Sequence, residues 1–264
     1  MRTFRIALWI VAGTVLVTTS LSCPKESPQA LLIMDATAMT SQTQCMIRPG
    51  ATGQAQMLRP YGVLDLAITN YYWLYPRIRN MMPTLQETSG EGPTGLYPKE
   101  TNYINIHTAR VHVNTGAFYS TYNATEGPTA DAYLYDGFTF DVVATVKPEE
   151  EGVVAIQVVP PDLGSLLAKK IQSRSDAKNP GIWISAIVQV EGRTQDLWTV
   201  HSNEFRFPIL TCYGCLIRCV TNDPTEPPVP GNIPCNPGQD DGVDNNFCPF
   251  VALDPSICRT ACPF

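Results

Sequence analysis

The sequence predicts an all-β fold, an antiparallel β-sandwich with one short helix and a cysteine-rich tail. Between about residues 31 and 210, apolar and polar residues alternate in many short segments, a pattern typical of antiparallel strands that bury one face. The chain has 23 prolines and 18 glycines but only 16% charged residues, which favours strands joined by rigid turns. Most of the nine cysteines follow residue 211, so a segment that needs covalent staples is expected there.

The N-terminus is a predicted secretory signal, residues 1–22. Two arginines precede an apolar run, Ile6 to Val17, and small polar residues follow it. The run is too short to span a membrane as a helix, which takes about 20 residues. It ends at Cys23, where the segment resembles a bacterial lipoprotein signal. That resemblance implies a lipid on Cys23, residues 23–30 as a tether, and a place in the outer membrane or at the cell surface.

Period-two alternation marks the strands of a predicted domain over residues 31–211. The expected inward faces are Leu64, Leu66 and Ile68; Phe138, Phe140, Val142, Ala144 and Val146; Val154, Ile156 and Val158; Ile182, Ile184, Ala186, Val188 and Val190; and Phe205, Phe207 and Ile209. In the first of these segments, "GVLDLAIT", Asp65 and Thr69 take the polar face. Several strands at this spacing predict an immunoglobulin-like β-sandwich.

One segment, "PPDLGSLLAKKIQS", breaks the alternation and predicts a short crossover helix. Its apolar residues at helical spacing are Leu163, Leu166, Leu167 and Ile171. Asp162 is the expected N-cap, and two lysines near the end suit the helix dipole. Gly164 weakens the helix, so we expect a short element that lies over an edge of the sandwich.

Residues 212–264 form a predicted tail in which covalent staples replace a core. If Cys23 carries lipid, eight cysteines remain, and an oxidising compartment can pair all of them. These are Cys45, Cys212, Cys215, Cys219, Cys235, Cys248, Cys258 and Cys262. Seven of the eight lie in the tail, so one of those seven must pair with Cys45 and clamp the tail onto the sandwich.

Zinc binding and redox catalysis are the alternatives for these cysteines. Cys212 and Cys215 have a C-x2-C spacing, and Cys258 and Cys262 have a C-x3-C spacing, both of which suit zinc. A thioredoxin-like site needs its C-x-x-C beside a βαβ pattern, and this sequence has no such pattern. Export favours structural disulfides over both alternatives.

The tail segment "GQDDGVDNN" is a candidate Ca²⁺ site. Its oxygen donors around a glycine are Asp240, Asp241, Asp244, Asn245 and Asn246. The segment is similar to the "DGxDNxC" calcium motif of some secreted bacterial proteins, but it lacks the EF-hand spacing. An Asx-rich turn without a metal is the interpretation that we favour, and no other cofactor is expected.

The aromatic stretch "NYYWLYPRIRNMM" is a candidate ligand-binding surface. Its aromatic residues are Tyr71, Tyr72, Trp73 and Tyr75. Such residues are enriched at recognition sites but also in cores, and core packing is the interpretation that we favour here. Burial of the rings would therefore count against a binding surface.

A secreted hydrolase is the least favoured function, because no nucleophile, base and orienting residue can be named together. The three histidines, His107, His112 and His201, are scattered along the chain. The first two lie five positions apart, on opposite faces if their strand has no bulge. Nucleic acid is not an expected partner, because the chain has a net charge of −6 and no lysine or arginine cluster.

Three stretches, "GVLDLAITNYYWLYPRIRN", "EFRFPILTCYGCLIRC" and "PCNPGQD", resemble a group of uncharacterised cysteine-rich lipoproteins from myxobacteria and related deltaproteobacteria. The resemblance implies an exported, lipid-anchored domain stapled by cysteines, and it implies neither catalytic residues nor a ligand. We therefore expect a non-catalytic envelope or surface protein with a structural or interaction role. Its expected partners are the membrane, through the lipid, and another envelope protein or a surface glycan. An adhesin or glycan binder that uses the aromatic stretch is the alternative.

Overall fold

The computed structural model of the protein describes residues 29–39, 45, 47, 58–84, 101–115, 137–172, 181–219, 235–244, 248–253 and 255–261. The predicted signal and most of the tether, with Cys23, lie outside the described residues, as do Asn245, Asn246 and Cys262. Strands dominate this part of the chain. None of its helices has the length and apolarity needed to cross a membrane.

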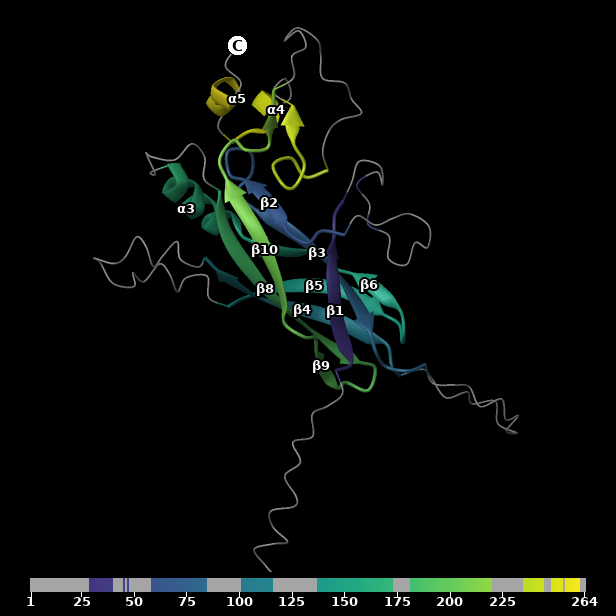
Figure 1. Cartoon of the computed structure of the whole chain (residues 1–264). Helices are drawn as coiled ribbons and strands as arrows, with labels where there is room; N and C mark the ends of the chain where they lie inside the picture. The colour runs from purple at the N-terminus through teal and green to yellow at the C-terminus, as the bar shows by residue number, and fades with distance from the viewer. Residues whose placement is uncertain are drawn as a thin grey trace, which may run out of the picture.

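Two β-sheets contain most of the strand residues in the described part of the chain (Figure 1). The first sheet has the order β1–β3–β6, and β7 also pairs with β3. Its strands are β1 (Leu31–Thr37), β3 (Tyr72–Asn80), β6 (Glu151–Val153) and β7 (Ile156–Val159). The second sheet has the order β2–β10–β8–β4–β5, and β9 pairs with β8. Its strands are β2 (Gly62–Asp65), β4 (Ile104–Asn114), β5 (Phe138–Val146), β8 (Ile182–Thr194), β9 (Thr199–His201) and β10 (Phe205–Cys212).

Residues from both sheets form one hydrophobic core, and the predicted alternation identifies many of them. The alternation is complete in β8, where Ile182, Ile184, Ala186, Val188 and Val190 are all buried. It is weaker in β5, an edge strand, where Phe138, Phe140 and Ala144 of the predicted inward face are only half-buried. The pattern therefore predicts the inward face of central strands best, because neighbours cover them on both sides.

The first predicted strand differs from expectation in two ways. β2 runs parallel to β10 rather than antiparallel. Both strands run toward the tail end of the molecule (Figure 1). The predicted polar face is wrong, since Asp65 and Thr69 are buried. The strand ends at Asp65, and the turn that follows it packs through Ile68 against the tail. The tail therefore covers residues that an isolated sheet would expose.

The predicted crossover helix is α3 (Pro161–Gln172), which connects β7 of the first sheet to β8 of the second. Its buried side includes Leu163, Leu167 and Ile171. The helix begins at Pro161, so Asp162 lies in the first turn and is not the N-cap; the fixed φ of proline suits a first helical position. Gly164 is buried where the helix passes the connection between β2 and β3.

The tail forms a small unit at the end of the sheets where β2 and β10 finish (Figure 1). Its elements are β11 (Ile217–Arg218), β12 (Val243–Asp244), α4 (Cys248–Val251) and α5 (Ser256–Ala261). The sequence predicted an irregular tail, but β11 and β12 pair in parallel. Val243, Cys248 and Cys258 are buried with Ile68 in a second, smaller hydrophobic cluster. The tail therefore combines a small core with its disulfides.

Candidate functional site

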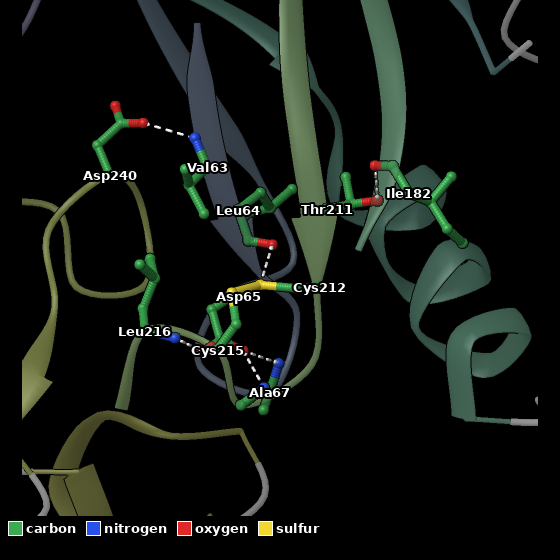
Figure 2. The surroundings of a disulfide bond; sticks show 11 residues. Val63, Leu64, Asp65, Ala67, Ile182, Thr211, Cys212, Cys215, Leu216 and Asp240 are labelled. Carbon is green, nitrogen blue, oxygen red and sulfur yellow. Dashed lines mark hydrogen bonds between the residues drawn. A yellow bond between two sulfur atoms is a disulfide. The ribbon is translucent and has the colours of Figure 1, made fainter. Parts of the chain in front are cut away.

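The tail meets the sheets at a buried acid, Asp65, the last residue of β2 (Figure 2). One carboxylate oxygen accepts hydrogen bonds from the backbone N–H groups of Ala67, at 3.0 Å, and Gly214, at 2.6 Å. The other oxygen accepts the backbone N–H of Leu216 at 2.8 Å. Asp65 therefore holds its own turn and the loop that follows β10 in one position.

Burial determines the electrostatics of this acid. Removal from water raises the pKa of Asp65 above its ordinary value of 3.8, because a low-dielectric environment disfavours the charged form. The backbone N–H groups oppose that rise, because they stabilise the carboxylate. The net effect is an increase. Asp65 is thus a carboxylate held by neutral donors in a dry environment, an arrangement suited to fixing a loop.

The loop that Asp65 holds contains a disulfide between Cys212 and Cys215 (Figure 2). Cys212 is buried and its sulfur lies 3.5 Å from the carbonyl oxygen of Leu64, whereas Cys215 is exposed. Gly214 between them has a φ of 76°, which favours glycine and permits the tight loop. A carboxylate oxygen of Asp65 and both sulfurs lie within 4.8 Å of one another. Only reduced thiols could offer that group to a metal, and here the two sulfurs bond to each other.

A second contact between tail and sheets involves Gln239. Its Oε1 accepts the backbone N–H of Trp73 at 2.9 Å, and its Nε2 donates to the carbonyl oxygen of the same residue. The side-chain amide therefore bonds the backbone of β3 beyond the end of its register with β1, which stops at Tyr75. Next to it, Asp241 forms an ion pair with Arg59 at 3.2 Å.

Asp240, between these two residues, contacts both sheets. Its carboxylate accepts the backbone N–H of Val63 in β2 and the hydroxyl of Tyr72 in β3, each at 2.7 Å. Burial raises the pKa of Asp240, and the two hydrogen bonds oppose the rise. Burial, and then the nearby Asp240 carboxylate, raise the pKa of Tyr72 well above its ordinary value. Gln239 and Asp240 thus fasten the tail to the sheets, and Asp241 fastens it to the segment that precedes β2.

The three described Ca²⁺ candidates of the tail, Asp240, Asp241 and Asp244, lie in different surroundings. Asp240 bonds to β2 and β3, and Asp241 pairs with Arg59 ahead of β2. Asp244 lies on β12, and Asn245 and Asn246 are outside the described residues. Within the described part of the chain, Asp240, Asp241 and Asp244 do not come together as a set of close ligand atoms. Asp240 accepts two hydrogen bonds and Asp241 forms an ion pair within the protein.

The tail is also linked covalently. Cys45 pairs with Cys235 across 190 positions, which confirms the predicted clamp between the N-terminal part and the tail. A second disulfide, Cys248–Cys258, joins α4 to α5. Cys219 is disulfide-bonded as well. Every cysteine among the described residues is therefore in a disulfide.

The four rings of the aromatic stretch differ in their exposure. Tyr72 and Tyr75 are buried, whereas Tyr71 is exposed. Trp73 is half-buried and packs edge-on against Phe140 of the second sheet, with ring centroids 5.5 Å apart. The rings therefore do not gather on one exposed surface, which favours the expected packing inside the protein over the alternative of a binding surface.

The histidines are placed by a β-bulge in β4. The register shifts between Ile106 and Thr108, so an extra residue puts His107 and His112 on the same outer side rather than on opposite faces. On that side, Glu191 of β8 lies 2.9 Å from Arg110, 3.7 Å from His201 and 3.9 Å from His107.

A groove of about 610 Å³ lies next to this charged group. Its lining includes Thr101, Asn105, His107, Arg193, Gln195 and Asp196. The volume is within the range of small-molecule sites, but such sites are mostly enclosed, and this groove is open to solvent.

Asp65 and Gln239 are among the junction residues whose roles sequence reasoning missed. The period-two pattern assigned Asp65 to a solvent face, because nothing in its own strand signals that a distant tail covers it. Gln239 directly precedes the Ca²⁺ candidates, but it was not singled out because its side chain is a neutral amide. Both act through partners more than 140 positions away.

No protein-family model matches the chain, and comparison with the curated proteins finds no match either.

Proposed function

We propose that the protein is an exported, lipid-anchored envelope or surface protein with a structural or interaction role and no catalytic one. The observation that carries the proposal is the cysteine pairing. All seven cysteines among the described residues are in disulfides, and disulfides persist in oxidising compartments outside the cytosol. Cys23 and Cys262 remain. A lipid on Cys23 leaves Cys262 as the partner of Cys219.

The two sheets, in this proposal, form an immunoglobulin-like sandwich with the tail as a cap on one end. The shared core and the crossover helix support that assignment. The buried polar side chains at the junction, Asp65, Gln239 and Asp240, are occupied in fastening the cap. These polar side chains therefore hold the tail against the sheets, which supports a structural or interaction role over catalysis.

The direction of the chain supports an interaction role for the cap. β1 begins at the end of the molecule opposite α4 and α5 (Figure 1). An anchor upstream of Leu31 would therefore leave the cap facing away from the membrane. Phe250 and Leu253 on the cap are largely exposed, and they are the apolar side chains that we expect another envelope protein to contact.

The intact mass of protein purified from its own membranes tests the proposal. We expect a diacylglycerol-sized increment on Cys23 and eight thiols that alkylate only after reduction. We also expect Cys23→Ser to move the protein from the membrane fraction to the supernatant with its disulfides still formed. An unmodified Cys23 together with unchanged fractionation would exclude the lipid anchor. Thiols that react without reductant would exclude the oxidising compartment.

A further inference from the structure

The turn between β8 and β9 exposes two large apolar side chains side by side in the sequence. Leu197 is 76% exposed and Trp198 is 75% exposed. Single exposed apolar residues are common, but adjacent ones at the tip of a turn indicate a contact surface. A tryptophan alone can bury about 150–250 Å² against a partner.

The turn holds these two residues outward in a fixed backbone conformation. Leu197 has a φ of 66°, which is rare for a bulky residue and persists only where neighbouring contacts determine it. Those contacts are present, because the N–H of Leu197 donates to the carbonyl oxygen of Thr194 at 3.0 Å. The N–H of Trp198 donates to the Thr194 hydroxyl at 3.1 Å, and the Thr194 N–H donates to the Trp198 carbonyl oxygen at 3.0 Å.

The turn lies at the end of the molecule where the N-terminal segment enters the fold. Leu31 forms a bridge with Ser202, directly after β9, and Figure 1 shows β9 and the start of β1 at the end opposite the tail. Met81, also half-exposed, donates its N–H to the carbonyl oxygen of Ala30 at 2.8 Å. Cys23 precedes Leu31 by eight positions, which span at most about 28 Å. A lipid on Cys23 would keep this end close to the bilayer.

We propose that Leu197, Trp198 and Met81 form a surface that contacts the lipid bilayer. The proposal rests on the anchor at Cys23 that is part of the proposed function. Tryptophan is enriched at the membrane–water interface, where its ring lies among the headgroups. Apolar side chains that enter this layer to about 5–10 Å add to the binding of a lipid chain. The contact orients the domain with its cap away from the membrane.

Quenching of tryptophan fluorescence tests the contact in the natural, lipidated protein reconstituted in phosphatidylcholine vesicles. Lipids brominated near the headgroup quench only tryptophans that enter the bilayer. We expect quenching in the wild type, its loss in Trp198→Ala, and its retention in Trp183→Ala, the matched control at another exposed tryptophan. Leu197→Asn keeps the reporter, because asparagine tolerates a positive φ. It should reduce the quenching.

The outcomes separate this proposal from the anchor on which it rests. If Cys23 carries lipid and the wild type is not quenched, the contact is excluded and the anchor stands. Equal quenching in Trp198→Ala and the wild type would also exclude this surface, since another tryptophan would then be the one in the bilayer. An unmodified Cys23 in the intact mass removes the anchor, and the proposed contact with it. A protein partner for the turn would leave protein-free vesicles without effect.

Discussion

The fully buried carboxylate of Asp65 accepts hydrogen bonds from three backbone N–H groups. One belongs to its own turn and two belong to the loop after β10. A buried N–H without an acceptor costs about 1–3 kcal/mol, whereas an exposed ion pair contributes about 0–1 kcal/mol. A single side chain therefore decides whether two distant segments can be buried together.

Asp65→Ala should lower the free energy of unfolding by roughly 3 kcal/mol, because it leaves several buried donors without acceptors. Urea denaturation with the disulfides intact measures the change. Glu150→Ala is the control, since Glu150 pairs with Lys147 where both side chains are largely exposed. Its loss should be below about 1 kcal/mol. Equal losses in the two variants would show that Asp65 does not hold the junction.

Asp240 should give the protein a distinctive pH dependence. Its pKa in the folded state lies above the ordinary value of 3.8, so the folded state binds a proton more readily than the unfolded state. The stability that this group contributes is then fully present below pH 3.8 and is lost as pH rises through the raised pKa. We expect the stability of the wild type relative to Asp240→Asn to fall as the pH rises above 3.8. Urea titrations at several pH values measure the difference, and a constant difference would contradict the shift.

At the scale of elements, local sequence patterns predicted the structural features that depend on residues close together in the chain. The inward face of β8 and the apolar face of α3 follow from periodicity, and the Cys45 clamp followed from counting cysteines. Long-range packing decided the rest. The burial of Asp65 depends on the tail, and the bulge at His107 depends on the pairing of β4 with two neighbours. Neither the burial of Asp65 nor the bulge at His107 can be predicted from the hydrophobic pattern of its own segment.

Gly164 in α3 shows how packing can reverse a propensity rule. The sequence marks it as a weak helical position, and alanine there would favour the isolated helix by about 1 kcal/mol. A Cβ at this position, however, would lie 1.8 Å from the carbonyl oxygen of Asn70. Gly164→Ala should therefore destabilise the protein by about 1–3 kcal/mol. Thermal denaturation measures this against Lys169→Ala on the exposed side of α3, and an increased Tm in Gly164→Ala would refute the close approach.

At the scale of the whole molecule, the tail is attached in two independent ways. Side chains of the tail bond to β2 and β3, and the Cys45–Cys235 disulfide ties the tail to a segment far away in sequence. Side-chain contacts can open and re-form, but the disulfide keeps the tail near the sheets while they are open. The disulfide should therefore raise stability and suppress local opening of the junction.

Replacing both members of this disulfide, Cys45→Ala with Cys235→Ala, separates these two effects. A link between positions 190 residues apart restricts the unfolded chain strongly, and its loss should lower the free energy of unfolding by about 2–5 kcal/mol. The fold should remain, because Asp65, Gln239 and Asp240 still hold the tail.

Hydrogen exchange at the Trp73 amide reports on the junction, since that N–H bonds to Gln239. The amide should exchange slowly in the wild type and faster in the double variant, because the tail can then detach without global unfolding. Unchanged exchange would mean that the side-chain contacts alone keep the cap closed.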